Sequence, residues 1–320
     1  MIFLDFEKPI EALYQKLTQL NQIQEDGDVN LDDKIAELED LIVQKKQEVF
    51  ENLTPWQKVE LSRHPERPYT LYYIHHIFES FTEMFGDRKL EDDKAIVGGL
   101  AKLDGKSVMV IGHQKGVNTK MRQYRNFGMA SPSGYRKAMR LMKLAEKFEI
   151  PVVTFIDTPG AYAGLEAEDF GQAEAIARNL YEMSILRTPI ISYVIGEGAS
   201  GGAIGIGVAD RLMMLENTWF TVISPESCSS ILWRSWDYKE QAAEQLNLTA
   251  TDMLNLKIVD SIVKEPLGGA HRHSKEMAKL LKSSIKRNLT NLAKIDIDVL
   301  LENRINKYAS IGVFEELKTK

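Results

Sequence analysis

Two neighbouring segments of this 320-residue chain repeat one pattern, a short apolar run that ends in a glycine-containing turn. Residues 151–157 (Pro-Val-Val-Thr-Phe-Ile-Asp) precede Thr-Pro-Gly-Ala, and residues 189–195 (Pro-Ile-Ile-Ser-Tyr-Val-Ile) precede Gly-Glu-Gly-Ala-Ser-Gly-Gly. Apolar runs of this length, bounded by turn residues, are typical of buried strands, and the residues between them fit one helix. The pattern predicts an α/β layered domain containing stacked strand–turn–helix units.

Other segments have the periodicity of helices or strands. Helices are predicted over 7–24, from an N-cap at Asn30 onward, and over 55–86, 131–148 and 171–186. Strands are predicted over 95–103, 107–113, 212–215 and 219–223, the first two joined by the hairpin dipeptide Asp104-Gly105.

We expect the chain to divide into three parts. Residues 1–54 form an N-terminal helical hairpin, residues 55–270 the α/β core, and residues 271–320 a C-terminal helical extension. Lys and Arg outnumber Asp and Glu in the extension, although the whole chain has a net charge of −6. The net charge argues against general nucleic-acid binding.

Composition excludes several classes of protein. With 44% hydrophobic and 27% charged residues the chain resembles an ordinary globular protein, and its apolar runs are too short to span a membrane. Its N-terminus lacks the features of a secretory signal, so a cytoplasmic location is expected. The single cysteine, Cys228, excludes an intrachain disulfide and a cysteine-rich zinc site on this chain. A P-loop is absent from the sequence, so direct ATP chemistry has no support.

The glycine cluster at residues 196–202 matches two known motifs. Gly196-x-Gly198-x-x-Gly201 is a dinucleotide-binding fingerprint, for which Glu216 would be the acidic residue about 20 positions on. Gly198-x-Ser200-x-Gly202 is a nucleophile elbow, as in serine hydrolases. The hydrolase hypothesis requires further residues in the order acid then histidine, for which the candidates are Asp252 or Asp260 and His271 or His273.

A third interpretation needs no side-chain nucleophile. Gly201 and Gly202 lie at a predicted helix start, where unpaired backbone N–H groups can stabilise a developing negative charge. Glycine also suits a tight turn or close helix–sheet packing, so this purely structural explanation stays open. The turn Thr158-Pro159-Gly160-Ala161 follows the preceding strand, and we expect the two turns to wall one crevice. The basic segment 115–125 is either a solvated loop or a contact for phosphates or a carrier.

Several motifs together resemble one family. They are Leu4-Asp-Phe-Glu-Lys-Pro, Arg67-Pro-Tyr-Thr-Leu, Asp92-Asp-Lys-Ala-Ile-Val-Gly-Gly, Gly112-His-Gln-Lys-Gly, Arg125-Asn-Phe-Gly-Met, Gly134-Tyr-Arg-Lys-Ala, Thr154-Phe-Ile-Asp-Thr-Pro-Gly-Ala-Tyr and Glu265-Pro-Leu-Gly-Gly-Ala-His. The chain closely resembles the carboxyltransferase alpha subunits of bacterial multi-subunit acetyl-CoA carboxylase, from its first helices to about residue 272. The resemblance implies a crotonase-like (ClpP/crotonase) fold of ββα units.

The resemblance also implies partners and cofactors. Family members pair with a separate beta subunit in an α2β2 assembly, and beta carries a four-cysteine zinc ribbon and most of the CoA-binding surface. Biotin is attached to the biotin carboxyl carrier protein, and ATP is consumed by biotin carboxylase. No metal and no ATP site are therefore expected on this chain.

The implied reaction transfers the carboxyl group from carboxybiotin to acetyl-CoA. The product is malonyl-CoA, and the step is the first committed one of fatty acid synthesis. By this resemblance the amides of Gly201 and Gly202 stabilise an enolate, while the substrates are bound by Thr158, Pro159, Gly160, Ala161, Gly198 and Ser200. A crotonase-fold serine hydrolase using Ser200, and a non-catalytic scaffold, are the alternatives.

Overall fold

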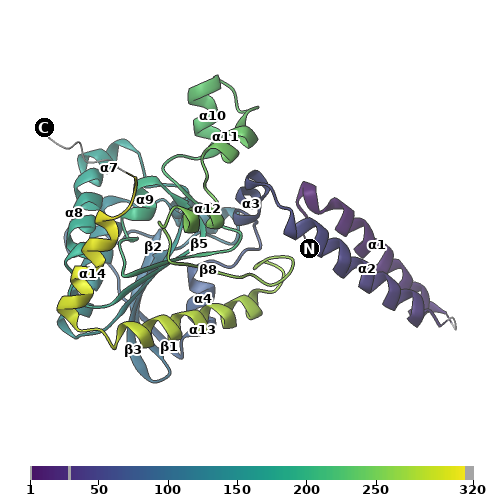
Figure 1. Cartoon of the computed structure of the whole chain (residues 1–320), viewed down its shortest axis with the longest axis horizontal. Coiled ribbons are helices and arrows are strands. Elements are labelled where there is room, and N and C mark those ends of the chain that lie inside the picture. The colour runs from purple at the N-terminus through teal and green to yellow at the C-terminus, as the bar shows by residue number, and fades with distance from the viewer. Residues whose placement is uncertain (1, 28–29, 314–320) are drawn as a thin grey trace, which may run out of the picture.

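The computed structural model describes residues 2–27 and 30–313 and is dominated by one mixed sheet (Figure 1). The strands lie in the order β1-β2-β3-β4-β5-β6-β8, and β7 pairs with β5 outside this path. β1, β2 and β3 are antiparallel, whereas the strands from β3 to β8 run parallel. The bounds are β1 Ser80–Glu83, β2 Ile96–Leu103, β3 Lys106–His113, β4 Val152–Thr158, β5 Ile190–Ala199, β6 Arg211–Leu215, β7 Trp219–Thr221 and β8 Ser261–Val263.

Side chains alternate between the two faces of the central strands. On β4, Val152 and Ile156 join one buried cluster, while Val153 and Phe155 join the other. The first cluster is covered by α6 (Pro132–Lys147), α8 (Gln172–Ser184) and α12 (Ala250–Asn255), and the second by α4 (Thr70–Ile77) and α13 (Ser274–Leu292). Burial on both faces explains why these strands read as continuous apolar runs. The predicted helices over 131–148 and 171–186 are confirmed.

The helix predicted over 55–86 is wrong. The segment forms α3 (Pro55–Ser62), α4 and strand β1. Pro68 disfavours helical geometry at the residue before it, which separates α3 from α4. β1 then pairs with β2, where Gly99 lies opposite Glu83 and a Cβ at Gly99 would overlap the Thr82 carbonyl. Pairing with an open sheet edge therefore overrides the local helical pattern.

Two helical hairpins project from the layered core (Figure 1). α1 (Lys8–Asp26) and α2 (Asp32–Glu51) form the first, in agreement with the two predicted N-terminal helices. The N-cap of α2 is Leu31 rather than Asn30, whose side chain instead accepts a hydrogen bond from the Asp32 amide at 2.9 Å. The second projection, α10 (Pro225–Trp233) with α11 (Lys239–Gln245), was not predicted.

The remaining helices are short except for α14. They are α5 Thr119–Tyr124, α7 Leu165–Asp169, α9 Ser200–Ile204, α14 Ile297–Ala309 and the 3-10 turns Asp5–Glu7 and Asn126–Gly128. α14 is held by Arg304, whose guanidinium binds Asp210 and the carbonyls of Met183, Leu186 and Thr188. Among the described residues, no helix combines the length and the hydrophobicity needed to cross a bilayer.

Candidate active site

The end of β5 follows a register shift in its pairing with β4. Ile156 of β4 pairs with Val194, but Thr158 pairs with Gly198, so β5 contains two more residues than β4 over this interval. From Glu197 onward, β5 pairs with β7 instead of β6. A side chain at Gly196 would overlap the Asp157 carboxylate, which accepts a hydrogen bond from the Glu197 amide at 3.0 Å. The strand thus extends to Ala199, four residues beyond its predicted end.

The helix α9 begins directly after β5, at Ser200. Ser200 is exposed and has a positive φ of 53°, a conformation that is uncommon for non-glycine residues. The amides of Ser200, Gly201 and Gly202 belong to the first helical turn, so they have no intrahelical acceptor. A Cβ at Gly201 would meet only the Ile176 side chain, at an ordinary 3.5 Å.

The turn at residues 158–161 packs directly on Gly202. A Cβ at Gly202 would lie 2.5 Å from the Gly160 carbonyl carbon and 2.7 Å from the Ala161 nitrogen. The Thr158 hydroxyl closes this turn, because it accepts from the Gly160 amide (3.1 Å) and donates to the Gly160 carbonyl (2.6 Å). Gly160 has φ +148°, which favours glycine, and Pro159 is exposed. The structure therefore brings the two predicted turns together, and Gly202 has a packing reason to be glycine.

A buried cluster of charges lies at the strand ends that carry these turns. The Lys115 ammonium is 2.7 Å from Asp157 Oδ1 and 2.5 Å from Glu197 Oε2. Arg63 donates to the other oxygen of Glu197 at 2.6 Å and also pairs with Glu226. Lys115 is 9% exposed, so the prediction of a solvated loop is wrong for this residue, which its buried carboxylate partners hold inside.

Burial and charge act in opposite directions on this cluster. Burial raises the pKa of the Asp157 carboxyl despite the neighbouring ammonium. Burial also opposes ionisation of Glu197, but Lys115 and Arg63 together hold the pKa of that carboxyl below its usual range. A cavity of about 260 Å³ adjoins the cluster. It is lined by Ser62, Arg63, Tyr69, Lys115, Arg122, Phe127, Pro159 and Glu197.

The residues of the serine-hydrolase hypothesis are dispersed. Asp252 caps α12 by bonding to Thr249, and Asp260 binds Arg211 and Lys307. His271 is buried beside Glu7 and His64, and neither of its ring nitrogens has a hydrogen-bond partner among the described residues. His273 is exposed at the start of α13. Within residues 2–27 and 30–313, Ser200 therefore has no acid–histidine pair among these candidates to activate it.

The dinucleotide hypothesis also fails on topology. Dinucleotide folds bind their ligand where the strand order reverses, but β4, β5 and β6 are neighbours in sequence order. The carboxylate of Glu216 is occupied by Lys264 and by the Glu265 amide. The helix that follows the glycine cluster has only five residues.

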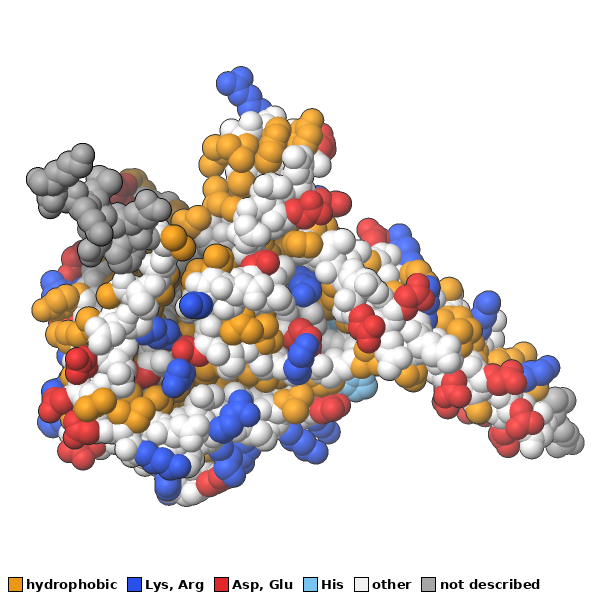
Figure 2. Space-filling model, in the orientation of Figure 1, with side chains coloured by type: hydrophobic (Ala, Val, Ile, Leu, Met, Phe, Trp, Pro, Cys, Tyr) orange, Lys and Arg blue, Asp and Glu red, His pale blue; other side chains and the backbone are white. Residues whose placement is uncertain are grey.

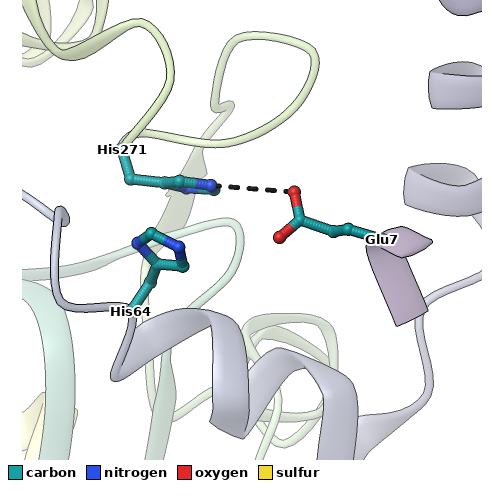
Figure 3. Close-up of side chains that lie close together, drawn as sticks. All are labelled: Glu7, His64 and His271. Carbon is teal, nitrogen blue, oxygen red and sulfur yellow. Dashed lines mark ion pairs between the residues drawn. The ribbon is translucent and has the colours of Figure 1, made fainter. Parts of the chain in front are cut away.

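Glu7, His64 and His271 form a second buried cluster, between the N-terminal segment and the core (Figure 3). Their ligand atoms lie within 4.8 Å of one another, and their chemistry suits zinc. However, His64 Nδ1 accepts from the Glu66 amide at 3.1 Å, and Arg272 binds the Glu7 carboxylate at 3.2 Å. The two imidazoles are also tilted against each other, with centroids 4.0 Å apart and planes 32° apart. The geometry favours an anchor for the N-terminal segment over a metal centre.

Comparison with known proteins gives a consistent family. The profile described as "Acetyl co-enzyme A carboxylase carboxyltransferase-like" matches residues 3–312. Two similar proteins are named acetyl-coenzyme A carboxylase carboxyl transferase subunit alpha. The protein from Chlorobaculum parvum is 56% identical, covering 98% of both chains, and that from Flavobacterium johnsoniae is 55% identical, covering 99% of this chain and 100% of its own. The chain belongs to the acetyl-CoA carboxylase carboxyltransferase alpha-subunit family.

Solved structures confirm the crotonase-like α/β fold of this alpha subunit. A Pseudomonas malonate decarboxylase hetero-tetramer chain matches with TM-score 0.59 at 16% identity, covering 75% of this chain and 94% of that one. A transcarboxylase 12S chain matches with TM-score 0.57 at 18% identity, covering 80% of this chain and 44% of that one. At these identities the likeness concerns the fold alone.

The structure explains two of the motifs that carry the family resemblance. Arg67, from Arg67-Pro-Tyr-Thr-Leu, forms a buried bidentate pair with Glu265, from Glu265-Pro-Leu-Gly-Gly-Ala-His, at 2.6 and 3.1 Å. Arg67 also donates to the Ile195 carbonyl of β5 at 2.9 Å. Sequence reasoning missed this pair, and also Arg63 and Glu226, although the first two residues stood in recognised motifs. Two motifs that are far apart in the sequence are thus joined by a buried ion pair, which also contacts β5 just before the glycine cluster.

Proposed function

We propose that this alpha subunit supplies half of a carboxyltransferase active site, in which the amides of Gly201 and Gly202 stabilise negative charge on a substrate oxygen. Biotin, borne on the biotin carboxyl carrier protein, carries the carboxyl group that is transferred to acetyl-CoA to give malonyl-CoA. Thr158, Pro159, Gly160, Ala161, Gly198 and Ser200 line the approach to these amides. The expected cytoplasmic location belongs to the same proposal.

The observation that carries this proposal is that a Cβ at Gly201 would meet only the Ile176 side chain, in ordinary van der Waals contact. Gly202 must be glycine because it touches Gly160, but no backbone of this chain requires glycine at 201. A glycine at a helix start allows close approach of an oxygen to the backbone N–H groups. Removing one such donor costs about 10²–10³ in rate.

The other half of the site belongs, in this proposal, to a zinc-ribbon beta subunit in an α2β2 assembly. The α10–α11 projection is rich in hydrophobic side chains (Figure 2), and Ile231, Leu232 and Trp236 are 64–70% exposed. Leu165 and Phe170, which follow the turn at residues 158–161, are exposed as well. Surfaces of this kind mark protein–protein contacts, as expected if another chain closes the site. In this proposal, ATP is consumed by biotin carboxylase and not by this chain.

The test uses Gly201→Ala and Gly201→Val in the complex with the beta subunit. Transfer of the carboxyl group from carboxybiotin should fall, and more for Val than for Ala, because each side chain holds the substrate oxygen away from the amides. Ala309→Val adds similar bulk at an exposed position on α14 and should leave the rate unchanged. Assembly with beta should be the same for all three variants.

Native rates in both Gly201 variants would overturn the assignment of these amides. Normal turnover by the beta subunit alone would instead support the scaffold hypothesis, in which the helical projections of this chain do the work.

A further inference from the structure

We infer that Lys115 is a positioning residue, whose ammonium sets the separation between the two glycine turns by binding the carboxylates of Asp157 and Glu197 together. The inference deepens the proposed function and rests on it, since positioning matters only if the turns bind substrate. Lys115 itself is not required to touch a reacting atom.

The covalent connections make this role specific. Asp157 directly precedes Thr158, the residue whose hydroxyl closes the first turn, and Glu197 directly precedes Gly198 of the second. One ammonium lies 2.7 Å from the first carboxylate and 2.5 Å from the second. Any change in its position therefore moves both strand ends, and with them the contact between Gly160 and Gly202.

Lys115 is itself fixed from a third element. It follows β3, and its stem packs against Gly128, where a Cβ would lie 2.9 Å from Lys115 Cγ and 3.1 Å from the Asp157 carbonyl. Its charged end borders the cavity of about 260 Å³ that also contacts Pro159. The cluster is therefore packed between the ends of β4 and β5 and the Gly128 segment, and it borders the cavity.

Without the ammonium, two carboxylates would face each other in a buried site. Two negative charges held close together in a buried site disfavour joint ionisation. The two carboxylates would therefore share one proton, and the apparent pKa of the pair would rise. The other charged and titratable groups around Lys115 are Arg63 with its partner Glu226, Arg122, Tyr69 and the buried His113. At high pH the two strand ends should repel, and at low pH the shared proton should bring them back together.

The test measures carboxyl transfer by the complex with beta, from pH 6 to pH 8.5, for Lys115→Met and for the double variant Lys115→Met/Asp157→Asn. Methionine keeps the stem and removes the charge. We expect kcat of the single variant to fall about 10²-fold at pH 8, as for a small misplacement of binding groups, with KM for acetyl-CoA changed less than about threefold. The ratio of variant to native kcat should rise as the pH falls.

The double variant should lie between the single variant and the native complex at pH 8, and its ratio to native should not depend on pH. It also carries the test if the single variant does not fold, because the Asp157→Asn change removes the like-charge repulsion. Lys279→Met, which replaces an exposed lysine on α13, is the matched control and should behave as native.

Three results separate the possibilities. A native kcat in either Lys115 variant, or a single-variant deficit that is equal at every pH, overturns the positioning role. Active Gly201 variants together with a pH-dependent Lys115→Met deficit would reject the amide assignment and retain the positioning role. Inactive Gly201 variants together with native activity in Lys115→Met would retain the amide assignment and reject the positioning role.

Discussion

Two buried ionic networks in this protein use similar groups for different ends. Arg304 on α14 gives its guanidinium to Asp210 and to three backbone carbonyls, and its side chain is 0% exposed. Lys115 binds only carboxylates among the partners found for it, and it borders a cavity. The first network is closed and joins the last helix to the core. The Lys115 network joins the ends of β4 and β5 and borders the cavity of about 260 Å³.

The difference lies in what each cation satisfies. A cation that satisfies backbone carbonyls cannot be removed without leaving buried acceptors unpaired. A cation that only balances carboxylates can be replaced in part by a proton, at a cost in geometry rather than in folding. The Arg304 network should therefore act mainly on stability and the Lys115 network mainly on activity.

The largest expected effect is the loss of the closed network. Arg304→Met leaves the buried Asp210 carboxylate without its counter-ion and the Thr188 carbonyl without its donor, which should lower the free energy of unfolding by about 3–5 kcal/mol. Urea unfolding monitored by circular dichroism measures the change. Turnover per folded complex should stay native, and a large fall in kcat at full stability would remove the distinction between the networks.

A second carboxylate substitution sharpens the comparison. Lys115→Met should lower stability at pH 8 by less than Arg304→Met does, and Asp157→Asn should restore most of this loss, because it removes the unbalanced charge. The matching pair, Arg304→Met with Asp210→Asn, should restore less, because the Thr188 carbonyl stays without its donor. The four substitutions, made singly and in their two pairs, form two double-mutant cycles by urea unfolding, and equal recovery in both would contradict the argument.

The anchor of Glu7, His64 and His271 provides a third, pH-dependent case. Burial lowers the pKa of His64 to about 4 and also lowers that of His271, so both rings are neutral when the N-terminal segment is in place. A depressed histidine pKa stabilises the anchored state above about pH 6.5, and this stabilisation is lost as the pH falls toward 4. For His64 alone the loss amounts to about 2 kcal/mol at pH 5.

Hydrogen exchange of the peptide around Glu7 at pH 7 and pH 5 measures this release, after correction for the intrinsic exchange rates. Protection should fall on acidification, and His64→Gln should reduce the pH dependence. His75→Gln, at an exposed position, is the control. Equal protection at both pH values would show that the rings tolerate protonation in place.

Much of the fold was predictable because its information is local. The apolar runs that became β4 and β5, the hairpin dipeptide between β2 and β3, and the proline at the start of α6 each act over a few residues. The short helices α10 to α12 and strand β8 lack such periodicity. The end of β5 was missed because Gly196, Glu197 and Gly198 read as a turn, whereas the Asp157 carboxylate holds them extended.

The site was predictable only in its backbone. Both glycine turns follow consecutive predicted strands, and so they could be expected to be neighbours. Lys115 pairs with Asp157 of β4 and Glu197 of β5, and Glu197 also pairs with Arg63, which directly follows α3. Each of these residues is more than 40 positions from Lys115 in the sequence, and no spacing rule joins them. Charge balance in a buried site is a tertiary property, so a run of basic residues could not reveal which of them turns inward.

The smallest expected effect concerns Ser200, and it tests whether this open region supports backbone or side-chain chemistry. Ser200→Gly removes the strain of a positive φ and adds chain entropy in the unfolded state, so stability should change by less than about 1 kcal/mol. Carboxyl transfer should change less than about tenfold, because the variant keeps the amides of the first helical turn, whereas a nucleophile could not be removed without abolishing turnover. A fluorophosphonate probe should leave Ser200 unlabelled, since Asp252, Asp260 and His271 are engaged or buried elsewhere. Labelling of Ser200 together with loss of activity in Ser200→Gly would instead support the serine-hydrolase hypothesis.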